Sequence, residues 1–191
     1  MKLRGDRTER GASLIEASIL IPLLLTLAIG LSEIGFLIID YMTVSNAARE
    51  GARAGAAAAN YDEVGVDADD LILESVEQAI CNLKYGHLVS VSIFQADSNG
   101  EPTGLINRFV EAPGGLICDS PGTGIICDDV SGTCPGPWAP QDRSRDPGGL
   151  DVLGVEVVFS HQDVTGLFPL VRREYSEAAI MQIEPDTRGG Q

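Results

Sequence analysis

The chain has 191 residues, enough for one modest domain beside a membrane segment, and a formal net charge of −15. From Tyr41 onward there are 23 acidic against 9 basic side chains, so nearly all of the excess negative charge follows the apolar N-terminal region. A surface this acidic repels phosphate backbones, which excludes DNA and RNA as partners.

The stretch from Leu14 to Ile39 predicts a transmembrane helix. About twenty apolar residues are enough to cross a bilayer, and this run of twenty-six is interrupted only by Glu16, Ser18, Thr26, Ser32 and Glu33. Loops rich in Lys and Arg stay in the cytoplasm, and the leader carries Lys2, Arg4, Arg7 and Arg10. We therefore expect a single-pass protein of the bacterial cytoplasmic (inner) membrane, with a cytoplasmic N-terminus and residues 41–191 outside.

The leader does not match an ordinary signal peptide, because the apolar core is too long and continues beyond Ser32 and Glu33. Glu16 lies at the cytoplasmic mouth of the span, five residues after Gly11. It is either an interfacial carboxylate that reaches the headgroups or part of a processing site. Cleavage after Gly11 would leave Ala12 as a free amine and Glu16 at the fifth mature position, an arrangement that resembles type IV pilin-like proteins, in which the carboxylate meets a neighbour's amine.

The wider stretch RGASLIEASILIPLLLTLAIGLSEIGFLIIDYMTVSNAAREGARAGA resembles the N-terminal signature of the TadE-like family. Its anchors are Arg10-Gly11-Ala12, Glu16, Pro22, Glu33-x-Gly35 and the segment from Asn46 to Arg53. The resemblance implies a membrane-anchored pseudopilin or minor pilin of a tight-adherence (Flp) pilus or a related secretion system. It also implies other pilins, tight-adherence inner-membrane assembly proteins and a prepilin peptidase as partners, besides the lipid bilayer.

Glu33 is predicted to be a functional intramembrane residue or a carboxylate near the outer interface. As partners for the first case we expect a polar group of a neighbouring subunit or its Arg49. Beyond Ile39 the alanine-rich sequence predicts that the helix continues to about Asn60. On it, Ala47, Gly51, Ala54 and Ala58 form a row of small residues that packs either on the chain's own domain, which we favour, or on other subunits as assembly contacts.

A small α+β domain is predicted after this helix. Ile72 to Leu83 has helical spacing, with acidic residues at its start, Lys84 near its end and Gly86 as a stop. Val89 to Ile93 alternates as a strand that ends at a turn over Asp97–Gly100, and 105–111 is a weaker strand that pairs with it. Strands near 153–159 and 175–184 complete an antiparallel sheet of three or four strands.

The segment 113–150, rich in Cys, Pro and Gly, is predicted to be a surface loop that forms no regular core. Cys81, Cys118, Cys127 and Cys134 favour two disulfides of unknown pairing over a zinc site, because no CxxC pair is present. The acidic residues of the loop lack a calcium-binding pattern, so we expect no metal. Trp138 is expected to plug the loop onto the domain rather than to form an exposed contact.

We expect no enzymatic activity and no cofactor. Nucleotide-binding, metalloprotease and nucleophile-elbow motifs are missing, and His161 beside Asp163 is more typical of a structural histidine than of an acid–base pair. The expected organisation is a leader over 1–11, a transmembrane helix over 12–40, its continuation over 41–60, the domain over 61–186 and a tail over 187–191. The alternative function is a permanently anchored envelope binding or adhesion module that never enters a filament.

Overall fold

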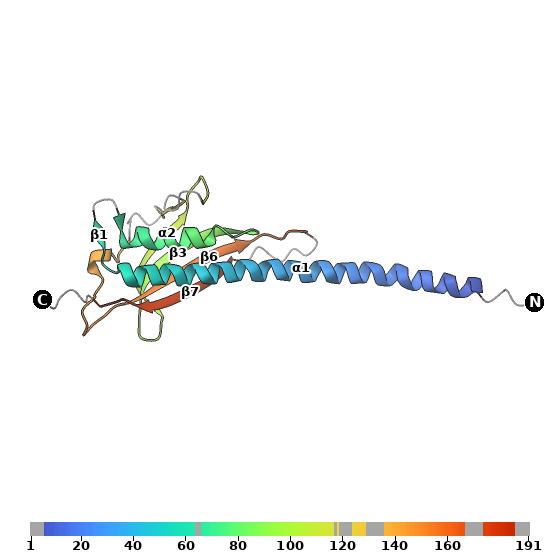
Figure 1. The fold of residues 1–191 in the computed structure, drawn as a ribbon, viewed down its shortest axis with the longest axis horizontal. Coiled ribbons are helices and arrows are strands. Elements are labelled where there is room, and N and C mark those ends of the chain that lie inside the picture. Colours follow the sequence, from blue (N-terminus) through green and yellow to red (C-terminus); the bar gives the residue numbers. More distant parts are fainter. Residues whose placement is uncertain are drawn as a thin grey trace, which may run out of the picture.

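The computed structural model describes residues 6–63, 66–116, 118, 124–128, 136–166 and 174–185. One long helix, α1 (Asp6–Ala58), runs out of a small folded body and carries the N-terminal end far from it (Figure 1). A short hairpin of β1 (Asp62–Glu63) and β2 (Val66–Asp67) leads to the second helix, α2 (Ala68–Ile80). The prediction of one continuous helix from the apolar stretch to about Asn60 is confirmed.

The remaining elements form one antiparallel sheet. Its strands are β3 (Gly86–Ala96), β4 (Pro102–Glu111), β5 (Ile125–Cys127), β6 (Val152–His161) and β7 (Glu174–Gln182), in the order β5-β4-β3-β6-β7. The α+β prediction is confirmed, but within the described residues the sheet has five strands where three or four were expected. The extra strand, β5, lies within 113–150, and it forms because its backbone pairs with the edge of β4.

Helices α1 and α2 lie side by side on one face of the sheet (Figure 1). Alternate residues of the central strands point toward them, among them Val91, Ile93, Val155 and Val157, and are fully buried. Ile72 and Val76 of α2 complete this core at helical spacing. The hydrophobic pattern therefore places the body of the protein around the second half of α1.

Helix α2 begins and ends at defined caps. The Asp67 side chain accepts a hydrogen bond from Asp70 N, and the Asp70 carboxylate accepts one from Asp67 N, each at 3.0 Å. The helix ends at Ile80 with Cys81 as its C-cap, so the prediction that it runs on to a stop at Gly86 is wrong. Gly86 instead begins β3, where a β-carbon would lie 3.1 Å from the Ser160 carbonyl oxygen.

The predicted turn between β3 and β4 is confirmed. The Asp97 carboxylate accepts hydrogen bonds from Asn99 N at 2.8 Å and Glu101 N at 2.9 Å. These bonds hold the pKa of Asp97 below its ordinary value, because they stabilise the ionised form. Gly100 follows with φ +88°, a conformation that favours glycine.

Candidate functional site

The first half of α1 has no contact with the folded body. The most apolar 18 residues of this helix have a mean hydropathy of 2.3 and are 0% buried. Among the described helices, α1 is the one long and apolar enough to cross a membrane. Apart from Ile29, the leucine and isoleucine side chains between Leu14 and Leu31 are exposed by about half or more. An apolar surface this long and this exposed is typical of a segment that is embedded in lipid or covered by another protein.

Three hydroxyl groups inside this half are satisfied by the helix itself. Thr26 Oγ1 donates to the Pro22 carbonyl at 2.8 Å, Ser18 Oγ to the Ile15 carbonyl at 2.7 Å and Ser32 Oγ to the Ile29 carbonyl at 2.8 Å. Pro22 lies within the helix without ending it. In hydrocarbon every polar group must find its partner within the protein, and these hydroxyl groups do so.

The residues predicted for processing lie at the beginning of α1. Gly11 and Ala12 are part of the helix, although their side-chain environments fall outside the description. Glu16 is exposed and has neither hydrogen bond nor ion pair to any other described residue. Its carboxylate is therefore available to a partner outside the chain. Cleavage after Gly11 and the contact of Glu16 with an amine stay predictions.

Glu33 is the point where the folded body first meets α1. Its side chain is 1% exposed, and its carboxylate accepts hydrogen bonds from Val164 N at 3.1 Å and from Thr165 N at 2.6 Å, together with the Thr165 hydroxyl. The donors lie in the connection that follows β6. The carboxylate thus has a partner within its own chain, rather than the neighbouring subunit or the water interface that the sequence suggested.

Asp40 makes a second contact two helical turns further along the same face. Asp40 Oδ2 lies within hydrogen-bond distance of His161 Nδ1, at 2.8 Å, and both side chains are buried. Between the two acidic residues, Phe36 packs against Tyr85 with ring centroids 4.5 Å apart. We call the contacts of Glu33 and Asp40 with residues 161–165 the clamp. His161 is a structural residue of this clamp and does not pair with Asp163.

The clamp combines residues that the sequence analysis treated separately or missed. Asp40 and Thr165 were not singled out, although the seven-residue spacing from Glu33 to Asp40 places both carboxylates on one helix face. Just beyond, Tyr41 donates its hydroxyl to Glu177 of β7. This bond to a carboxylate, with the negative charge of Glu177, raises the pKa of Tyr41. Helix α1 is therefore fixed to the folded body between Glu33 and Tyr41.

The row of small residues lies against the chain's own domain. Ala47 is fully buried, and a β-carbon on Gly51 would approach Val76 Cγ2 to 2.5 Å and Val155 Cγ1 to 3.3 Å. Ala54 and Ala58 are half-buried. Of the two alternatives, packing within the chain is the one observed, so Ala47 and Gly51 have no free surface for the assembly contacts considered for them.

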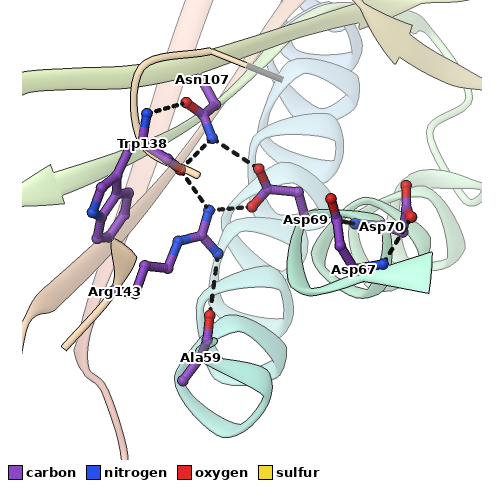
Figure 2. Close-up of polar contacts among 7 residues, drawn as sticks. All are labelled: Ala59, Asp67, Asp69, Asp70, Asn107, Trp138 and Arg143. Carbon is purple, nitrogen blue, oxygen red and sulfur yellow. Dashed lines mark hydrogen bonds and ion pairs between the residues drawn. The ribbon is translucent and has the colours of Figure 1, made fainter. Parts of the chain in front are cut away.

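At the other end of the body, a buried polar cluster joins the loop before β6 to both helices (Figure 2). Arg143 pairs with Asp69, and both side chains are almost wholly buried. Asn107 Nδ2 donates to Asp69 Oδ2 and to the Trp138 carbonyl, each at 2.8 Å, and the Arg143 guanidinium lies 4.6 Å from the centre of the Trp138 ring. Burial raises the pKa of Asp69, and Arg143 opposes this shift.

This cluster corrects the prediction for 113–150. Trp138 is 1% exposed, which confirms that it plugs the loop onto the domain, and a 3-10 turn, η2 (Pro140–Asp142), follows it. Gly136 has φ +120°, and a β-carbon there would meet Asn107 Oδ1 at 2.4 Å. The segment forms part of the core because these charges and the indole ring are buried together.

The predicted disulfides are confirmed in part. Cys81 at the end of α2 is bonded to Cys118, with the Cα atoms 5.6 Å apart. Cys127 is also disulfide-bonded, whereas Cys134 lies outside the described residues. The zinc alternative is therefore wrong for Cys81, Cys118 and Cys127, because their sulfur atoms are used in disulfide bonds. The Cys81–Cys118 bond at the end of α2 holds the cysteine-rich loop to the body.

Comparison with known proteins gives one match. Residues 11–53 match the sequence model of the family described as TadE-like protein. No curated protein and no solved structure matched the chain. The matched segment contains the exposed half of α1, Glu33, Asp40 and the small residues packed against α2. The similarity to the TadE-like family is confined to residues 11–53 of the 191-residue chain.

Proposed function

We propose that this protein is a membrane-anchored minor pilin or pseudopilin that takes part in assembling a tight-adherence pilus or a related secretion system. The observation that carries the proposal is the division of α1. Its first half is apolar and bare, and its second half is the spine of a folded body, within a segment that matches the TadE-like family. The proposed role is structural and requires no catalysis.

The position of Glu33 supports a membrane-embedded first half. The 19 residues from Leu14 to Ser32 precede the clamp and rise about 28 Å as a helix. A bilayer's hydrocarbon core is about 30 Å thick, so this segment spans it and the folded body begins at its outer surface. The basic leader favours a cytoplasmic N-terminus, which places the disulfides in an oxidising compartment.

Glu16 is proposed to act in assembly. A carboxylate at the edge of a bilayer is unfavourable alone and tolerable when it is paired with a cation. Glu16 has no partner among the described residues, so it is available to the amine that cleavage after Gly11 would create on another subunit. Mass spectrometry of the mature protein tests the cleavage, with Ala12 expected as the first residue. An intact Met1 in assembled material would exclude it.

The assembly role is tested by deleting the gene and counting pili by electron microscopy. We expect pili to be lost and to return when the full-length chain is supplied. Glu16→Gln should be present in the membrane at normal amount and fail to restore them, whereas Glu50→Gln, an exposed carboxylate further along α1, should restore them. A deletion strain with the normal number of pili would refute the proposed function.

A further inference from the structure

The second half of α1 exposes one stripe to solvent. Met42, Asn46, Arg49, Arg53 and Ala57 are all exposed, and their spacing of three or four residues places them on one helix face, opposite the buried alanines. Glu50, which is also exposed, lies beside Arg49 at the edge of this face. We call these five residues the α1 stripe. Beside Met42 the surface is hollowed by a shallow pocket lined by Tyr41, Met42, Ser45, Asn46 and Arg49.

The α1 stripe carries two cations that the folded body does not use. Arg49 and Arg53 have neither an ion pair nor a hydrogen bond to other described residues. They lie one turn apart in a chain whose part beyond Tyr41 has 23 acidic and 9 basic side chains. Two free guanidinium groups on a rigid helix are complementary to a second helix that presents carboxylates.

Helix α2 presents such a surface. Its exposed residues Asp70, Glu74 and Gln78 are spaced by four and form a second stripe, which we call the α2 stripe. Glu74 has neither a hydrogen bond nor an ion pair to other described residues, whereas Asp70 is used in the cap of α2. The two stripes thus carry opposite charge on neighbouring helices of the same body (Figure 1).

The two stripes also lie at the same height. Gly51 of α1 packs on Val76 and Gly55 packs on Ile72, so the two helices run antiparallel. A residue further along α1 therefore lies level with an earlier residue of α2. By this correspondence Arg53 is level with Glu74. Copies held in one membrane by the same span have the same height, so a sideways displacement brings the α1 stripe of one copy to the α2 stripe of the next.

We propose that a second copy of this chain docks through its α2 stripe on the α1 stripe, with Arg53 of one copy facing Glu74 of the next. The inference rests on the proposed function and adds the partner and the contact. Joining two α1 stripes would oppose arginine to arginine, which disfavours a closed dimer. A contact between different surfaces leaves one stripe free on each terminal copy, so it adds further copies instead of stopping at a dimer.

The test is cross-linking of the full-length chain in lipid vesicles. Among the described residues no cysteine is free, so introduced thiols react selectively. Copies with Asn46→Cys mixed with copies with Gln78→Cys should give a dimer with a short bifunctional maleimide, whereas each variant alone should give little. The double variant should give a ladder of oligomers. Ser176→Cys, exposed on the outer face of β7, is the control and should not join to Asn46→Cys.

Charge reversal tests the pairing. Arg53→Glu and Glu74→Arg should each reduce the mixed dimer severalfold, and a chain with both substitutions should recover it. A dimer of Asn46→Cys with itself as the main product, a yield no greater than with the Ser176→Cys control, or indifference to both reversals would overturn the proposal. Normal pili in a strain with Arg53→Glu would also overturn it while leaving the proposed function intact, whereas normal pili after gene deletion would refute the function.

Discussion

Replacing Glu33 by Gln tests whether the clamp holds α1 to the folded body. The carboxylate accepts two backbone N–H bonds and one hydroxyl bond through its two oxygens. The amide has one oxygen, and its NH₂ group cannot accept from Val164 N. At least one charge-assisted hydrogen bond is therefore lost, and the bonds to Thr165 become neutral.

The magnitude follows from the bonds and their exposure. A hydrogen bond to a charged group contributes about 1.5–3 kcal/mol and a neutral one about 0.5–1.5 kcal/mol. Val164 and Thr165 are exposed, so water can replace part of what is lost. We expect Glu33→Gln to lower the free energy of unfolding by about 2 kcal/mol, mainly by loosening the β6–β7 connection.

The assay combines denaturant unfolding of the full-length chain in detergent micelles with amide hydrogen exchange at Val164 and Thr165. Glu50→Gln is the matched control, because Glu50 is exposed on the same helix and its substitution should change stability by less than about 0.5 kcal/mol. Exchange should accelerate at both amides in Glu33→Gln only. Equal stability of the two variants with unchanged exchange would refute the clamp.

Three further predictions concern the body. Arg143→Met should destabilise it by about 3–5 kcal/mol, because Asp69 is left charged and buried, and unfolding midpoints similar to those of the wild type would contradict this. Gly51→Ala should destabilise by about 1–3 kcal/mol through overpacking, whereas Gly35→Ala, where a β-carbon meets nothing within 4 Å, should be neutral or stabilising in the same measurement. The lowered pKa of Asp97 stabilises the fold above its unfolded pKa, a contribution lost as the pH falls through the folded pKa below 3.8. Asp97→Asn should remove this part of the loss of stability at acid pH. A pKa of the Asp97 carboxyl at or above 3.8, measured by NMR titration, would contradict the prediction.

Local patterns predicted most of the elements. The apolar run and the alanine-rich continuation predicted α1, and alternation predicted β3 and β6, because these patterns repeat at the period of the element they form. Packing of the small-residue row on the chain's own domain was the favoured of two alternatives, and Ala47 and Gly51 pack in this way. In each case the deciding residues lie within a few positions of one another.

The contacts that join distant segments could not be predicted in this way. Glu33 meets Thr165 across 132 residues, and Asp69 meets Arg143 across 74. No local period links such positions, and their partners depend on how the sheet is assembled. The short strand β5 was missed for the same reason, since it exists only through pairing with β4.

The most direct test of membrane anchoring compares two side chains of equal exposure. Leu24 and Met42 on α1 are both 61% exposed in the isolated chain, so protection of Leu24 but not of Met42 is the result that a surrounding bilayer would produce. In intact membranes a membrane-impermeant maleimide should label Met42→Cys and leave Leu24→Cys unmodified, with both labelled after denaturation. Equal labelling of the two before denaturation would contradict the proposal that the first half of α1 spans the membrane.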